Sequence, residues 1–89
     1  MSGEMYEIIF SKKAQNYYDR LPDNLVRKIN KVIQEMEVNP WSGDVKGIAG
    51  EIGTFRRRIG ELRITYQVDI KAMRIYIDRI GPRGDVYKK

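Results

Sequence analysis

The chain has 89 residues, of which 42% are hydrophobic and 33% are charged, and this composition is typical of one folded domain spanning residues 1–89. It contains no cysteine and no histidine, which excludes a disulfide framework and removes the commonest metal ligand and general base. We therefore expect no metal, no cofactor and a reducing, cytoplasmic setting. No apolar run approaches the roughly 20 residues that span a bilayer, and Met1–Phe10 has no basic residue, so we expect neither a membrane span nor a signal peptide.

The net charge of +5 is unevenly distributed. Residues 1–45 contain six Lys/Arg and seven Asp/Glu, whereas residues 46–89 contain eleven Lys/Arg and five Asp/Glu. A basic excess confined to the second half indicates a polyanionic partner, most simply a nucleic acid. A basic surface that only keeps the protein in solution is the alternative, and charge alone does not decide between them.

The first half of the chain predicts a strand and then a helix. The β-forming residues of Met5–Phe10 indicate the strand, and Ser11 follows as the helix cap. Apolar residues then recur at positions 14, 17, 18 and 21, which form one stripe on a helix, and Pro22 ends it.

A second helix is expected to follow at once. Asp23 or Asn24 is expected to cap it, and Asn39-Pro40 closes it. The short connection predicts that the two helices form an antiparallel hairpin. The apolar stripe of the second helix comprises Leu25, Ile29, Val32, Ile33 and Met36.

From residue 42 onward the pattern changes. Residues 42–53 carry four glycines and predict a loop with a brief strand at 45–48. A period of two then predicts strands at 55–60, 62–68 and 73–80, joined by tight turns. We expect an α+β fold: an N-terminal strand, an antiparallel helix hairpin and a three- to four-stranded antiparallel sheet whose apolar face packs on the helices.

The other face of this sheet is expected to be open and basic, whereas Tyr66 faces the core. Converging arginines suit phosphate, because the guanidinium group is planar, always charged and able to bind bidentately. An exposed tyrosine can stack on a base. A solvated face that serves only solubility is the alternative. Side chains alternate between the two faces of a strand, a property that we call parity. By parity, four arginines and one tyrosine are expected on the open face: Arg56, Arg58, Arg63, Arg74 and Tyr76.

Residues 55–66, FRRRIGELRITY, resemble the arginine-rich signature of the RelE/ParE superfamily of type II toxin–antitoxin toxins. Leu21-Pro22, Lys46-Gly47-Ile48 and the closing segment Gly81–Tyr87 fit the same pattern, so the resemblance covers nearly the whole chain. It implies a fold similar to small microbial ribonucleases and a place closer to the RelE-like mRNA interferases. Members of that branch are metal-independent endoribonucleases that cleave mRNA in the ribosomal A site and so inhibit translation.

The resemblance also implies roles for single residues. Arg56 and Arg58 stand where the best-known bacterial branch has lysines, and an arginine stabilises a phosphorane but does not act as a base. Tyr87 is then the expected base, as a phenolate favoured by nearby positive charge. The implied catalytic set is Arg56, Arg58, Arg63, Arg83 and Tyr87. The residues expected to bind RNA are Lys46, Arg56, Arg58, Arg63, Arg74, Tyr76 and Lys88.

As a RelE-like toxin, the chain is expected to act on the ribosome and its mRNA. It is also expected to be neutralised by a cognate antitoxin, through an acidic or amphipathic segment packed across the sheet or against the helix hairpin. Two alternatives stay open: a ParE-like inhibitor of DNA gyrase, and a catalytically inactive member that only binds RNA. The C-terminal Arg83 and Tyr87 favour the ribonuclease branch over the gyrase inhibitor.

Overall fold

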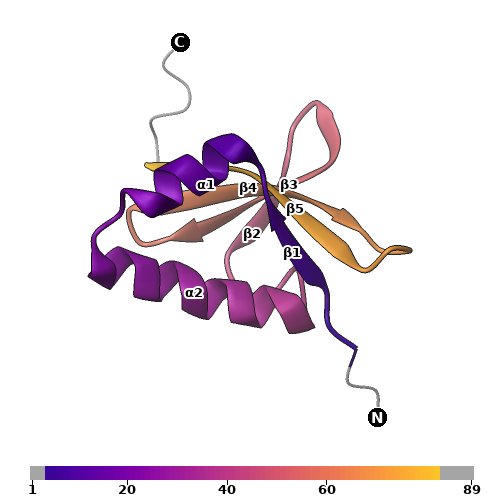
Figure 1. Ribbon diagram of the computed structural model, residues 1–89. Coiled ribbons are helices and arrows are strands. Elements are labelled where there is room, and N and C mark those ends of the chain that lie inside the picture. The colour runs from indigo at the N-terminus through magenta and orange to yellow at the C-terminus, as the bar shows by residue number, and fades with distance from the viewer. Residues whose placement is uncertain (1–3, 83–89) are drawn as a thin grey trace.

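The computed structural model describes residues 4–82 and has two layers, a five-stranded sheet and a pair of helices that covers one of its faces (Figure 1). The strands lie in the order β1-β5-β4-β3-β2. The α+β class and the helix hairpin are therefore as predicted. The elements in chain order are β1 (Glu7–Phe10), α1 (Lys12–Asp19), α2 (Asp23–Val38), β2 (Val45–Ile48), β3 (Glu51–Ile59), β4 (Leu62–Asp69) and β5 (Arg74–Pro82).

The core lies between the helices and one face of the sheet. Leu25 and Ile33 of the predicted α2 stripe lie at its margin and are partly buried. Neither helix of residues 4–82 is long and apolar enough to cross a membrane. The buried hydrophobic side chains come from both helices and from β4 and β5: Ala14, Ile29, Val32, Met36, Leu62, Ile64, Tyr66, Ile75, Ile77 and Ile80.

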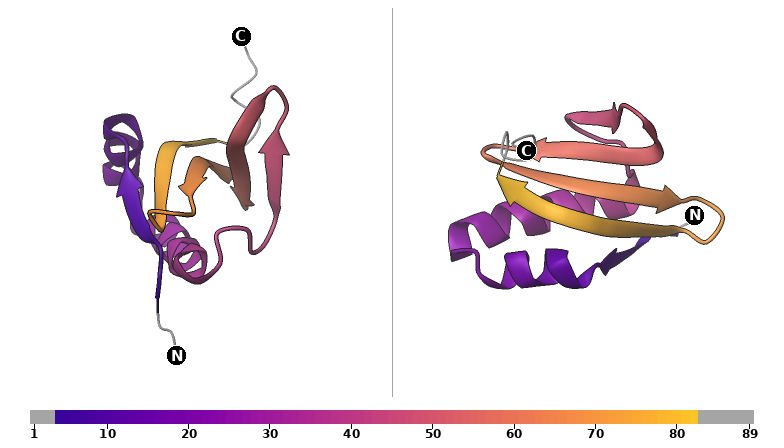
Figure 2. Two further views of the ribbon diagram at one scale, coloured as in Figure 1. Left: turned by 90° about the vertical axis from the view of Figure 1, so that its right-hand side faces the viewer. Right: turned by 90° about the horizontal axis from the view of Figure 1, so that it is seen from above.

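The sheet is mixed, whereas the sequence predicts an antiparallel one. β1 runs parallel to β5, with Ile8 opposite Ile75, and the other three strand pairs are antiparallel. The helix hairpin carries the chain from β1 at one edge, across the apolar face, to β2 at the other edge (Figure 2). The pairing of β1 with β5 joins segments far apart in the sequence, so the local pattern carries no signal for it.

The two helices begin differently. Ser11 caps α1 as predicted, because its hydroxyl accepts a hydrogen bond from the backbone N–H of Ala14 at 3.0 Å. The predicted cap of α2 by Asp23 or Asn24 is wrong: the N-cap residue is Pro22, and no side chain caps this helix. Asp23 instead occupies the first turn, where a negative charge interacts favourably with the helix dipole.

The strand boundaries differ from the prediction at two turns. Residues 42–53 are not mainly loop, because β3 already begins at Glu51 and forms a hairpin with the predicted strand β2. Gly50 has a φ of 82°, which an L side chain rarely adopts, and this allows the tight turn. β5 begins at Arg74 because Met73, expected in the strand, has a φ of 57° in the preceding turn.

A bulge in β5 decides which of its side chains face the helices. The register shifts between Thr65 and Tyr66 of β4, which leaves Asp78 as the extra residue in β5. Strict alternation after Ile77 would turn Arg79 to the core and Ile80 outward. With the bulge, Ile80 is buried and Arg79 is exposed.

Candidate nucleic-acid interface

The sheet face turned away from the helices carries a group of cations on neighbouring strands. Lys46 of β2 lies opposite Arg56 of β3, and Arg58 of β3 lies opposite Arg63 of β4. Adjacent strands are about 4.8 Å apart, so residues directly opposite each other are neighbours. We call this group the basic cluster: Lys46, Arg56, Arg58 and Arg63.

Arg63 is buried, with only 5% of its surface exposed, although the sequence predicts an open position for it. The reason is its place in the sheet: β4 is the central strand, and β3 and β5 flank it on both sides. The side chain of Arg58 is 38% exposed. Arg63 is thus the deeper and Arg58 the more accessible of two directly opposite positive charges.

Arg58 has a carboxylate neighbour that the sequence pattern does not indicate. The Nε atom of Arg58 lies 3.5 Å from Oδ2 of Asp44, the residue before β2. The backbone N–H of Arg58 also donates to the Asp44 carbonyl at 3.1 Å. Because the Asp44 side chain is 54% exposed, the ion pair contributes at most about 1 kcal/mol. A phosphate of a ligand can therefore replace this carboxylate at little cost.

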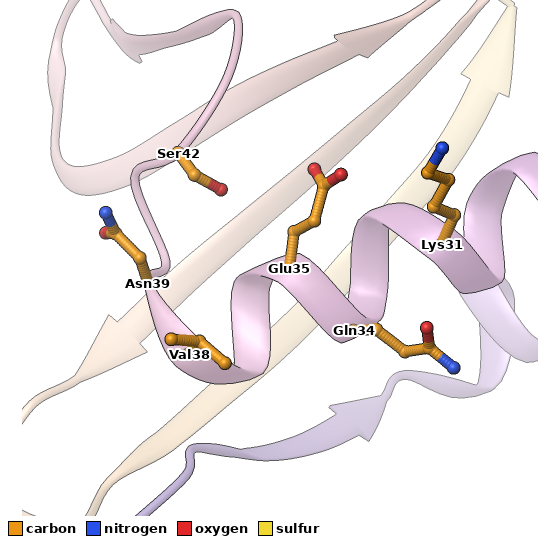
Figure 3. Close-up of a pocket in the computed structure, with 6 residues that line it drawn as sticks. All are labelled: Lys31, Gln34, Glu35, Val38, Asn39 and Ser42. Atoms are coloured by element: carbon orange, nitrogen blue, oxygen red, sulfur yellow. The ribbon is translucent and has the colours of Figure 1, made fainter.

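Arg57 faces the helices, as parity predicts, and ties the loop after α2 to the sheet. Its Nη1 donates to the Ser42 carbonyl at 2.8 Å, and its Nη2 lies 3.2 Å from Oε1 of Glu35. Glu35 extends from α2 toward the strands, and it lines a hollow of about 520 Å³ together with Ser42 (Figure 3). Gly43 has a φ of 81° and packs against the Arg57 guanidinium, where a side chain has no room. These contacts fix the loop that presents Asp44 to Arg58.

Tyr66 fixes the start of the same loop. Its hydroxyl donates to the Pro40 carbonyl at 2.6 Å, and its side chain is fully buried. Burial raises the pKa of Tyr66 to about 12, although the charge of Arg57 acts in the opposite direction. Tyr66 is therefore a protonated core residue, as predicted, and no candidate for a base at neutral pH.

Arg74 and Tyr76 lie far from the basic cluster, although they share its face. Gly81 of β5 lies opposite Arg63, and Arg74 is seven residues earlier in the same strand, which places the two about 20 Å apart. A hydrogen bond with the Tyr76 side chain and the nearby charge of Glu7, whose Oε1 is 3.4 Å from Nε, raise the pKa of Arg74. Parity thus predicts that Arg74 and Tyr76 share a face with the basic cluster. It does not predict how far along the strand they lie from it.

The remaining predicted site residues, Arg83, Tyr87 and Lys88, lie outside the described residues. Within residues 4–82, no group of three or more acidic side chains is placed to hold a metal ion. The basic cluster consists of lysine and arginine alone. Its chemistry is the binding of phosphate and the stabilisation of negative charge.

Solved structures of toxins share this fold. A chain of the archaeal RelE–RelB complex from Pyrococcus horikoshii is 26% identical, with a TM-score of 0.80 over 90% of this chain and 97% of that one. A chain of the toxin–antitoxin complex RelBE2 from Mycobacterium tuberculosis is 23% identical, with a TM-score of 0.78 over 94% and 98%. The YoeB dimer from Staphylococcus aureus is 26% identical, with a TM-score of 0.72 over 85% and 94%. The protein thus has the fold of the RelE-like toxins.

The sequence gives a family as well. Residues 8–87 match the profile of the family described as the ParE toxin of the type II toxin–antitoxin system, parDE. Because the match covers nearly the whole chain, this chain belongs to that family and is the toxin component of a toxin–antitoxin system. No curated protein matches it in sequence.

Proposed function

We propose that this toxin is a ribosome-dependent endoribonuclease that cleaves mRNA in the A site and so inhibits translation. The observation that carries the proposal is the pairing of Arg58 with Arg63 across β3 and β4. This places two positive charges directly opposite each other on the open face, and Arg58 is accessible to a ligand. Such a pair suits the binding of an RNA phosphate. The 26% identity to a chain of the RelE–RelB complex supports the same assignment.

In the proposed reaction, the RNA 2′-hydroxyl attacks the adjacent phosphorus and the bond to the 5′ oxygen breaks. The products are a cyclic phosphate and a free 5′-hydroxyl, since the attacking oxygen loses a proton and the leaving oxygen gains one. Arg58 and Arg63 stabilise the negative charge that develops on the phosphorane oxygens. An arginine does not lose its proton, so neither residue acts as the base. This step needs no metal ion.

Tyr87 is the proposed base, and Arg83 is a proposed further ligand of the phosphate. Both roles rest on the resemblance of residues 81–87 to the RelE-like branch. Gly81 lies opposite Arg63, so this segment starts beside the basic cluster. The variant Tyr87→Phe keeps the ring and removes the proton acceptor, which makes it the sharpest test of this role.

We further propose a cognate antitoxin as partner, because the RelE–RelB and RelBE2 structures are toxin–antitoxin complexes. An acidic or amphipathic segment of the antitoxin is expected to neutralise the basic cluster. Exposed apolar side chains, among them Val38, Trp41 and Ile52, offer it further contacts. A toxin that acts on ribosomes works in the cytoplasm.

Cleavage of mRNA during in vitro translation tests the proposal. The full chain at saturating concentration is expected to cut the message only when ribosomes are present. The variants Tyr87→Phe and Arg83→Ala are expected to lower the rate by about 10² or more, as the loss of an acid–base or charge-stabilising group does. An intact message in the presence of saturating toxin would sink the proposal.

A gyrase inhibitor is the second candidate, and the match to the ParE family favours it. On this account the basic cluster contacts gyrase or its DNA, and no RNA is cut. A supercoiling assay with the same preparation discriminates between the two candidates. Inhibited supercoiling with an intact message reverses the assignment. RNA binding that survives Tyr87→Phe, without cleavage in any context, identifies an inactive RNA-binding member.

A further inference from the structure

A second group of cations lies between α1 and β5, beside the basic cluster. β1 stops pairing with β5 at Ile77, and α1 flanks the rest of that strand (Figure 2). There Lys13 of α1, Arg20 at the C-cap of α1 and Arg79 of β5 line a pocket of about 380 Å³. All three side chains are exposed. We call this feature the α1–β5 pocket.

The charges of this pocket are not compensated by carboxylates within residues 4–82. No acidic residue lines it, and none of its three cations takes part in the ion pairs of Arg57, Arg58 and Arg74. The nearest carboxylate along α1, Asp19, accepts a hydrogen bond from Gln15. Asn16 and Tyr17 add neutral donors to the lining, an amide and a phenol, and Ile80 and Gly81 form the rest of it. Such a surface suits an anion.

The pocket adjoins the basic cluster through one residue. Gly81 lines the pocket and lies opposite Arg63, which in turn lies opposite Arg58. With strands about 4.8 Å apart, the lining of the pocket therefore begins one strand away from Arg63. We propose that the α1–β5 pocket binds the sugar–phosphate backbone of RNA next to the phosphate held by the basic cluster. This inference rests on the proposed function for the choice of RNA.

An acidic segment of a partner protein is the competing ligand, and the composition of the pocket speaks against it. Protein interfaces are anchored by aromatic and aliphatic side chains at their centres. The exposed large hydrophobic residues of the described chain all lie outside this pocket. Its aromatic residue, Tyr17, is partly buried and packs against the core. Cations and neutral donors without an apolar anchor are typical of contacts to phosphate.

The test compares two double variants of the full chain that remove the same charge. Lys13→Ala/Arg20→Ala changes the pocket, and Arg27→Ala/Lys28→Ala changes exposed positions of α2 outside it. Binding is measured to a single-stranded RNA with 2′-O-methyl groups throughout, which cannot be cleaved, over a range of salt concentrations. The pocket variant is expected to bind about fivefold or more weakly and to lower the slope of log K against log salt by about 1.4, or about 0.7 per phosphate contact. The α2 variant is expected to differ from the unmodified chain by less than about twofold.

Any result in which RNA binding by the two double variants does not differ as predicted overturns the inference. If both double variants lose the same affinity for RNA, only the net charge of the protein matters. If the unmodified chain does not bind RNA, RNA is not the ligand of the pocket. If the pocket variant binds RNA normally but no longer binds the antitoxin, the ligand of the pocket is an acidic protein. The variant Arg79→Gln, which perturbs no helix residue, repeats the test if the double variant unfolds. A chain that cuts no mRNA and still shows the predicted difference refutes the proposed function and leaves this inference standing.

Discussion

Arg57 and Arg58 are consecutive in β3, face opposite sides of the sheet and have different carboxylate partners. The side chain of Arg57 is 12% exposed and pairs with Glu35 on the helix side. The side chain of Arg58 is 38% exposed and pairs with Asp44 on the other side. Arg57 therefore stabilises the fold, whereas Arg58 is accessible to a ligand. Parity predicted this division from the sequence alone.

Replacing Asp44 by Asn is predicted to strengthen RNA binding by about two- to fivefold at low salt, the range that an exposed ion pair can supply. The carboxylate competes with phosphate for Arg58, and the amide keeps its shape without its charge. Binding of the same uncleavable RNA measures the effect. A weaker complex would mean that Asp44 orients Arg58 for the ligand and does not compete with it.

Replacing Tyr66 by Phe is predicted to lower the unfolding free energy by about 1–2 kcal/mol at pH 8, because the Pro40 carbonyl loses its partner. The difference from the unmodified chain is predicted to shrink and then to change sign as the pH rises from 10 to 12. Over that range the tyrosine of the unfolded chain ionises while Tyr66, with a pKa of about 12, stays protonated in the fold. The unfolded state then binds fewer protons than the folded state, so the unfolding free energy of the unmodified chain falls by at most about 2.7 kcal/mol. Urea unfolding of both chains at pH 8 and pH 11 measures this, and a constant difference would contradict it.

At the scale of elements, the helices were the most predictable part of the fold. Their apolar stripes and Ser11 carry strong local signals, and the structure confirms them. The bulge in β5 had a signal that strict alternation ignores: Ile77 and Ile80 are three residues apart, and both are buried. The parallel placement of β1 beside β5 had no local signal, because the contact depends on the whole topology.

Ser11 links two of these elements, and replacing it by Ala is predicted to lower the unfolding free energy by about 1–2 kcal/mol. Its hydroxyl accepts from the N–H of Ala14 and donates at 2.7 Å to the carbonyl of Asp78, the bulge residue. Ser11→Thr keeps the hydroxyl and is predicted to recover most of the loss. Urea denaturation measures both variants. A loss below about 0.3 kcal/mol for the alanine variant would show that the bulge does not depend on this contact.

At the scale of the whole molecule, the sequence predicted which face these arginines share, and it did not predict their depth or their spacing along the strands. Parity placed Arg58, Arg63 and Arg74 on one face, as observed. It could not place Arg63 in a buried position, because burial depends on the order of strands. Nor could it separate Arg74 from the other two, because that depends on register along β5. Asp44 was missed because it belongs to a loop that tertiary contacts hold.

We therefore propose that RNA is processed at the Arg58–Arg63 end of the sheet and not at the Arg74 end. The two ends offer a matched pair of residues: Arg58 lies 3.5 Å from Asp44, and Arg74 lies 3.4 Å from Glu7. Their side chains are similarly exposed, at 38% and 48%. Either substitution by alanine removes one charge and one surface ion pair.

The most direct measurement is the single-turnover rate of mRNA cleavage on programmed ribosomes for Arg58→Ala and Arg74→Ala. We expect a loss of about 10² or more for Arg58→Ala, the effect of removing one group that stabilises transition-state charge. We expect a change below about threefold for Arg74→Ala, as for a surface ion pair. Equal losses, or a larger loss for Arg74→Ala, would contradict the proposal.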